Sequence, residues 1–230
     1  MNDLTRAFGE TRARVIELAL SIDEAAAATV VPACPAWNVH DLVAHIAGVS
    51  GDVITGTVGG AGSEAWTGAQ IEARAEASLV ELVDEIESKG AEVEAALEFL
   101  HPAVEAAIFG DLVTHEHDLR GALGRPGARD STAVKIALES YVRFFGRRIK
   151  DAGLPSIAVE GDQESWIAGA GDAHARVAAP NFSLLRGLTG RRTHDEIRAF
   201  TWDGERDEYV AIFSMYGTPQ RSLREDQPSP

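Results

Sequence analysis

The chain has 230 residues, of which 45% are hydrophobic, so it can bury a core as one large domain or two small ones. Acidic residues outnumber basic residues by 36 to 21, which gives a formal net charge of −15 at pH 7. A charge of this sign repels phosphate backbones and anionic membrane surfaces, so neither nucleic acid nor a membrane is expected as a partner.

The sequence predicts neither an export signal nor a membrane-spanning segment. The first 20 residues carry scattered charges, and no apolar run approaches the roughly 18 residues of a membrane-spanning helix. The only cysteine, Cys34, cannot form an internal disulfide, which favours a cytoplasmic location. Cys34 lies between two prolines and is interpreted as a buried small residue rather than a nucleophile.

Helical periodicity dominates the first two thirds of the chain. Apolar residues recur at helical spacing in five segments, at residues 4–22, 39–49, 68–100, 104–123 and 132–153. Asn38, with Asp41 three residues later, is expected to cap the second helix, and Gly90 is a possible weak point in the third. These segments make a set of four or five helices, and the short connections between them predict an up-and-down bundle.

The character of the sequence changes beyond Pro155. The segments "SIAVEGD" and "HARVAAP" predict short strands, Asn181 is expected to cap a helix, and Thr193 with Glu196 forms a capping box for another. The predicted fold class is therefore α+β: a four-helix bundle over residues 1–153, a small α+β domain over residues 154–225, and a disordered tail at 226–230.

The densest group of polar residues is "DLVTHEHDLRGALG", at residues 111–124. On a strand, His115 and His117 would share a face, whereas on a helix they point about 160° apart. The helical spacing of the neighbouring Ile108, Leu112, Leu119 and Leu123 predicts a helix.

On that helix three polar side chains form one stripe beside the apolar face: Asp111, His115 and Asp118. His117 is expected to face solvent, and Glu116 with Arg120 is expected to form an ordinary surface ion pair.

A carboxylate and an imidazole one helical turn apart can reach the same metal ion. A catalytic zinc commonly takes three protein ligands, and His45, on the inner flank of the second helix, is the candidate for the third. Two alternatives to a metal site remain open. His45 could be a core histidine bonded to a backbone carbonyl, with Asp111 and His115 a hydrogen-bonded pair, or the residues could form an acid/base dyad without metal.

Three segments carry a family resemblance: "VPACPAWNVHDLVAHIAGV", "DLVTHEHDLRGALG" and "LLRGLTGRRTHDEIRAFTWDG". Together they resemble the mycothiol-dependent maleylpyruvate isomerase family, whose N-terminal bundle is related to DinB. The resemblance implies a divalent metal, with zinc expected, held by His45, Asp111 and His115. The family pattern has glutamate where this chain has Asp111, so the side chain is one methylene shorter.

The resemblance also implies the cofactor mycothiol, whose thiol would supply the sulfur that Cys34 is badly placed to give. Asp118 could accept the second ring N–H of His115 and orient it, or could be a simple ion-pair residue. Arg191 and Arg192 could meet a carboxylate of cofactor or substrate, or form a surface pair.

The implied activity is thiolate addition to an electrophilic small molecule, as an isomerase or an S-transferase. The alternatives are a binding module that has lost turnover and a purely structural protein. A homodimer is possible, and no catalytic residue is assigned.

Overall fold

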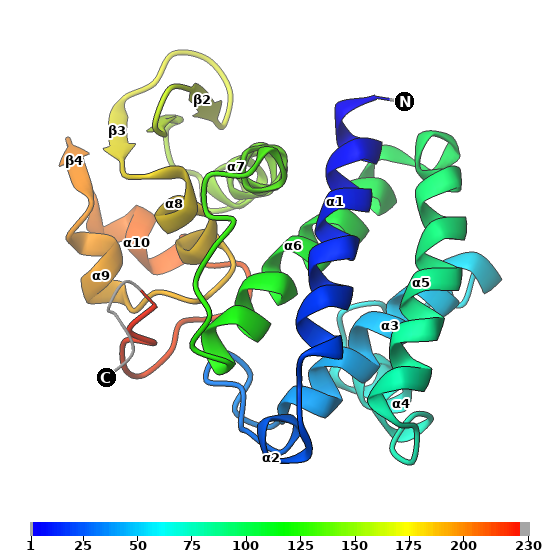
Figure 1. Cartoon of the computed structure of the whole chain (residues 1–230). Helices are drawn as coiled ribbons and strands as arrows, with labels where there is room; N and C mark the ends of the chain where they lie inside the picture. The colour runs from blue at the N-terminus through cyan, green and yellow to red at the C-terminus, as the bar shows by residue number, and fades with distance from the viewer. Residues whose placement is uncertain (1, 226–230) are drawn as a thin grey trace. The chain divides into compact units, whose positions relative to one another are not determined.

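The computed structural model describes residues 2–225 and divides into two compact units, Met1–Gly127 and Ala128–Pro230. Figure 1 shows helices throughout the chain and a small sheet in its last third. This arrangement confirms the predicted fold class of a helical bundle followed by a small α+β unit. The predicted disordered tail, residues 226–230, lies outside the described residues.

Four long helices form the bundle of the first unit: α1 (Asp3–Leu20), α3 (Val39–Thr55), α5 (Leu79–Ala96) and α6 (Pro102–Ala122). Helices α1 and α3 each pack against both α5 and α6, so the four helices close around one core. Fully buried apolar side chains fill that core, including Val15, Val43, Leu82, Val93 and Val113. Burial of such side chains stabilises each helix far more than its intrinsic propensity does.

The start of α3 is fixed by the capping box that the sequence predicts. The Asn38 side chain accepts a hydrogen bond from the Asp41 amide at 2.9 Å, and Asp41 accepts one from the Asn38 amide at 3.0 Å. The preceding turn folds back, with the Val31 amide bonded to the Trp37 carbonyl at 2.9 Å. This turn places Trp37 beside His45, in the first half of α3.

The prediction of one helix over residues 68–100 is wrong. The structure has α4 (Glu64–Glu72), a break, α5, and then the short 3-10 helix η1 (Leu97–Phe99). The break arises because Ser78 caps α5 in a second capping box, with Glu81. Gly90 lies inside α5, where a Cβ atom would come within 2.4 Å of the Arg12 side chain, so glycine there permits close approach of α1.

The second unit is built on α7 (Thr132–Asp151) and a four-stranded sheet of order β2-β1-β3-β4. Strands β1 (Ile157–Glu160) and β3 (Ala175–Ala178) pair in parallel at the centre. At the two edges, β2 (Ser165–Ala168) pairs antiparallel with β1, and β4 (Thr201–Asp203) pairs antiparallel with β3. Helix α7 packs against β2 and against α8 (Asn181–Leu188). The remaining helices are α2 (Glu24–Ala27) in the first unit, and α9 (His194–Arg198) and α10 (Asp207–Ile212) in the second.

The predictions for this region are partly correct. The two predicted strands are β1 and β3, and the Thr193–Glu196 capping box opens α9. Asn181 is not a helix cap: α8 is preceded by Pro180, and the Asn181 side chain instead accepts a hydrogen bond from the Asp162 amide at 3.1 Å. The division places α7 in the second unit, whereas the sequence expectation ends the bundle at residue 153. That domain boundary stays a prediction.

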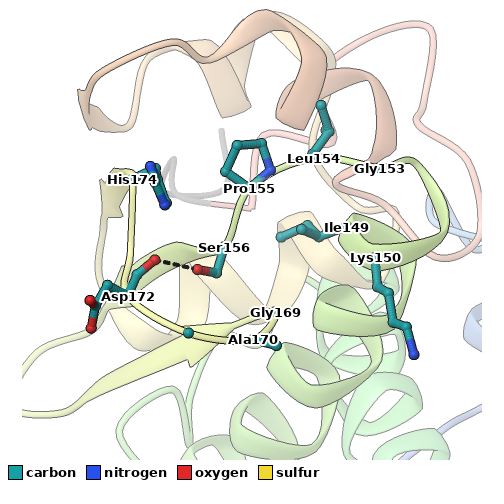
Figure 2. Close-up of a pocket in the computed structure, with 11 residues that line it drawn as sticks. Ile149, Lys150, Gly153, Leu154, Pro155, Ser156, Gly169, Ala170, Asp172 and His174 are labelled. Atoms are coloured by element: carbon teal, nitrogen blue, oxygen red, sulfur yellow. Dashed lines mark hydrogen bonds between the residues drawn. The ribbon is translucent and has the colours of Figure 1, made fainter.

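A pocket of about 420 Å³ lies where the end of α7 meets the β2–β3 loop (Figure 2). Ser156, one of the residues that line it, donates a hydrogen bond to the Asp172 carbonyl at 2.6 Å. None of the site residues predicted from the sequence lines this pocket. Among the described residues, no helix is both long and apolar enough to cross a membrane.

Candidate metal centre

Helices α3 and α6 bring three of the predicted residues together in the bundle. His45 Nε2 lies 3.6 Å from Asp111 Oδ2, and His115 Nε2 lies 3.4 Å from Asp111 Oδ1. All three donor atoms fall within 4.8 Å of one another. Both histidines are buried, whereas 32% of the Asp111 side chain is exposed. Solvent therefore contacts the cluster through Asp111.

The spacing of these donors fits a divalent metal ion. Two ligand atoms bound about 2.0–2.2 Å from one tetrahedral ion lie about 3.3–3.6 Å apart. The two measured nitrogen–oxygen distances, 3.6 and 3.4 Å, fall in that range. Two imidazoles and one carboxylate are also the donor types of catalytic zinc sites, which keep a fourth position open.

Each histidine is held through its other ring nitrogen. His45 Nδ1 lies 2.7 Å from the Gln70 side-chain oxygen, and His115 Nδ1 lies 3.0 Å from Asp118 Oδ2. Both contacts leave Nε2 directed at Asp111. Asp118 therefore makes the contact with His115 that one of its two sequence interpretations requires, whereas Gln70 was not predicted from the sequence.

The charges of the cluster shift two protonation equilibria. Burial would raise the pKa of the Asp111 carboxyl, but the His115 and His45 rings outweigh it and hold that pKa well below its usual range. Burial would lower the pKa of the His115 ring, but Asp111 and Asp118 outweigh it and raise that pKa to about 9. The protonation of Asp111 and that of His115 therefore each depend on the charge of the other side chain.

Aromatic rings surround the two imidazoles. The centroid of the Trp37 ring lies 5.0 Å from that of His45 and 6.0 Å from that of His115, and Trp66 lies 6.2 Å from His45. The proline-rich turn supplies Trp37 and α4 supplies Trp66. Rings of this kind exclude water, which strengthens electrostatic interactions at the cluster.

A second group of potential ligands shares one histidine with the first. Cys34, His115 and Asp118 also place their donor atoms within 4.8 Å of one another, with Cys34 Sγ 3.8 Å from Asp118 Oδ2. Cys34 is half-buried. The sequence interpretation placed this cysteine away from the chemistry, and that interpretation is wrong because the proline-rich turn folds back toward α6.

The solvent-facing interpretation of Glu116 and His117 is also wrong. The Glu116 side chain is 0% exposed, and it accepts hydrogen bonds from Arg120 at 3.0 Å and from Arg14 of α1 at 2.7 and 2.8 Å. His117 is buried as well. The charge of Glu116 suggested an exposed position, but Arg14 of α1, 102 residues away in the chain, neutralises that charge inside the bundle.

Arg191 and Arg192 belong to the second unit, where both are buried rather than forming a surface pair. Arg192 and Arg186 form ion pairs with the Glu225 carboxylate. Burial would raise the pKa of Glu225, but the two guanidinium groups outweigh it and lower that pKa. The carboxylate that this arginine cluster binds is therefore internal to the unit.

Comparison with known proteins identifies the relatives of this chain. Residues 8–130 match the family model described as the mycothiol maleylpyruvate isomerase N-terminal domain. A crystal structure of the mycothiol-dependent maleylpyruvate isomerase matches with a TM-score of 0.59 at 12% identity, covering 90% of this chain and 94% of that one.

A histidine-to-alanine mutant of the mycothiol-dependent maleylpyruvate isomerase matches over the same shares, with a TM-score of 0.57 and 12% identity. No curated protein matches the sequence. Identity this low supports the shared fold alone, whereas the family model spans more than half of the chain. The chain therefore belongs to the mycothiol maleylpyruvate isomerase family, through its N-terminal domain.

Proposed function

We propose that this protein is a metal-dependent enzyme that uses mycothiol to attack an electrophilic small molecule, as a cis–trans isomerase or an S-transferase. The observation that carries the proposal is the convergence of His45, Asp111 and His115 from two helices. Family membership supplies the expectation of mycothiol. The lone cysteine and the acidic charge suit a cytoplasmic enzyme with a small-molecule substrate.

His45, Asp111 and His115 are the proposed metal ligands, and zinc is the proposed metal. Aspartate at 111 is shorter than the glutamate of the family pattern, but its two oxygens already lie 3.6 and 3.4 Å from the two imidazole nitrogens. This spacing supports direct ligation by Asp111. Asp118 is the proposed orienting partner of His115, through the 3.0 Å contact to Nδ1.

A bound divalent cation would favour the thiolate form of a coordinated thiol at neutral pH. The chain's own contribution is to hold the two Nε2 atoms and the Asp111 carboxylate in place and to surround them with Trp37 and Trp66. The exposed part of Asp111 supports entry of cofactor and substrate from that side.

In the isomerase, the thiolate sulfur would form a bond to one alkene carbon while the π electrons move onto the acceptor carbonyl. Rotation about the resulting single bond, followed by loss of the same thiolate, would give the other isomer. In the S-transferase, the carbanion would instead take a proton and the adduct would be released.

Arg191 and Arg192 remain the proposed contacts for a carboxylate of cofactor or substrate. Glu225 now pairs with Arg192 and with Arg186, so an incoming carboxylate would have to compete with it. Replacing Glu225 with glutamine should then strengthen carboxylate binding. A loss of binding in that variant would count against this role.

Metal analysis of untagged protein tests the proposal directly. We expect close to one zinc or similar ion per chain, lost in His45→Ala and in His115→Ala. Mycothiol should raise the melting temperature of the metal-loaded protein, because a ligand that binds only the folded state stabilises it. Protein that neither contains nor takes up metal would refute the proposal.

An assay with mycothiol and a panel of electrophiles separates an enzyme from a binding module. An enzyme forms conjugate or isomer, whereas a module that has lost turnover shows only the thermal protection. The binding module is the second candidate because Asp111 is one methylene shorter than the glutamate of the family pattern.

A further inference from the structure

Gln70 is a buried residue whose side-chain amide lies between the His45 ring of the candidate metal site and the Asp52 carboxylate. It lies on α4, it is 3% exposed, and its side chain spans the distance between two residues of α3. Its oxygen lies 2.7 Å from His45 Nδ1, and its nitrogen lies 2.7 Å from Asp52 Oδ2. Such a residue orients others and does not contact the reacting atoms.

The order of donors and acceptors along this chain of contacts has one consistent solution. An ionised carboxylate only accepts hydrogen bonds, so the Gln70 atom that faces Asp52 must be the NH₂ group. The Gln70 oxygen then faces His45 and accepts, so Nδ1 must carry the proton. In a neutral imidazole the other nitrogen, Nε2, is then unprotonated and holds the lone pair that binds a metal.

The alternative tautomer has an acceptor close at hand. His45 Nε2 lies 3.6 Å from Asp111 Oδ2, so without Gln70 the ring proton would be drawn to Nε2 by that carboxylate. A proton at Nε2 would block the nitrogen that faces the cluster. Gln70 therefore holds the His45 ring proton on Nδ1, although the Asp111 carboxylate attracts it to Nε2.

Two further observations show that this contact is built into the bundle. Helix α4 packs against α3 at Gly48, where a Cβ atom would come within 2.7 Å of the Gln70 Cβ. At the other end, Arg74 donates to the Gln70 backbone carbonyl at 3.1 Å and forms a two-pronged ion pair with Glu85. The position of Gln70 is thus fixed at its backbone as well as at its amide.

We propose that Gln70 and Asp52 form a relay that locks His45 in the Nδ1–H tautomer and so prepares Nε2 to bind the metal. The relay rests on the proposed function, because it assigns His45 as a ligand. It makes Gln70 a positioning residue, and it gives the two histidines different supports: a neutral amide behind His45 and a carboxylate, Asp118, behind His115.

The tautomer can be measured on metal-free protein by the ¹⁵N chemical shifts of the His45 ring, at a pH where that ring is neutral. We expect a protonated Nδ1 and an unprotonated Nε2 in the wild type. Gln70→Leu should move the proton to Nε2 or give a mixture. A wild-type ring protonated at Nε2, or a Gln70→Leu ring unchanged from wild type, would overturn the relay.

Metal affinity tests the consequence of the relay. Loss of a residue that orients a ligating histidine typically weakens metal binding about 10–100-fold, and we expect a loss of this size for Zn²⁺ in Gln70→Leu. Gln70→Glu keeps an acceptor for His45 but places two carboxylates together, so it should lose stability and keep Zn²⁺ affinity close to wild type. A purely structural role for Gln70 predicts instead that affinity follows stability in both variants.

Two more variants sharpen the test. Gly48→Ala should push Gln70 away from His45 and weaken Zn²⁺ binding without changing any polar group. Ser50→Ala is the matched control, because Ser50 is a buried polar residue of α3 whose hydroxyl donates to the Ile46 carbonyl. Its Zn²⁺ affinity and His45 tautomer should both match wild type. A wild type that binds no Zn²⁺ would defeat the proposed function, while the tautomer measurement would still decide the relay.

Discussion

Glu116 offers the sharpest test of how the tertiary structure changes the meaning of a sequence pattern. From the sequence it forms an exposed pair with Arg120, and such pairs contribute about 0.3–0.5 kcal/mol. In the structure its fully buried carboxylate binds Arg120 and also Arg14 of α1. Glu116→Gln removes the charge and leaves two guanidinium groups sharing one amide oxygen.

The expected cost follows from the burial of the partners. Removing one partner of a fully buried ion pair costs about 3–5 kcal/mol, because the other charge is left uncompensated. The side chains of Arg14 and Arg120 are 23% and 14% exposed, so water can recover part of that loss. We therefore expect a destabilisation of about 3 kcal/mol, which for a chain of this length corresponds to a fall of about 6–12 °C in melting temperature.

Chemical denaturation combined with hydrogen exchange of the α1 and α6 amides would measure this loss in the first unit alone. Glu92→Gln is the control in the same bundle, since Glu92 forms an exposed pair with Lys89 at 2.9 Å. It should change stability by no more than about 0.5 kcal/mol. If Glu116→Gln were as mild as this control, the reasoning from burial would be refuted.

Three further predictions follow from the same structure. The folded-state pKa of Glu225 is lowered by its two arginine partners, so its contribution is present above the pKa of the unfolded chain and is lost as the pH falls through the folded value. Acid denaturation should therefore be steeper in wild type than in Glu225→Gln, and identical profiles would contradict this. The pKa of His115 is raised from 6.5 to about 9, so metal-free protein gains stability from this ring below pH 6.5 and loses it as the pH rises through about 9. Urea titrations of wild type and His115→Gln should converge at high pH, and a constant difference would count against the coupling. Gly146→Ala should destabilise the second unit despite the better helix propensity of alanine, because its Cβ would lie 2.7 Å from the Gly169 amide nitrogen. Thermal unfolding measures this effect, and an unchanged or raised melting temperature would show that the two backbones can separate.

The predictions that held depend on information local to one helix. Helical periodicity placed Asp111, His115 and Asp118 on one stripe of α6, and the Asn38–Asp41 capping box fixed where α3 begins. With that start fixed, His45 falls on the inner flank of its helix. The family resemblance, carried by the same motifs, is confirmed by the match of residues 8–130.

The predictions that failed concern contacts between segments that lie far apart in the chain, and one break between two helices. The periodicity of α6 gives the direction of Glu116 but not the arginine that α1 brings to cover it. The proline-rich turn around Cys34 has no periodicity, so only the folded chain shows that it returns to Asp118. The helix expected over residues 68–100 hid the break before α5 and, with it, the separate helix that carries Gln70.

The sequence by itself therefore determined where α3 and α9 begin, the stripe of polar residues on α6 and the three residues proposed to bind the metal, because backbone capping and hydrophobic spacing act within a few residues. Only the tertiary structure decided which partners those residues meet: Gln70 for His45, and Arg14 for Glu116. Contacts of this kind join helices far apart in the chain, and their geometry depends on packing that no local pattern encodes.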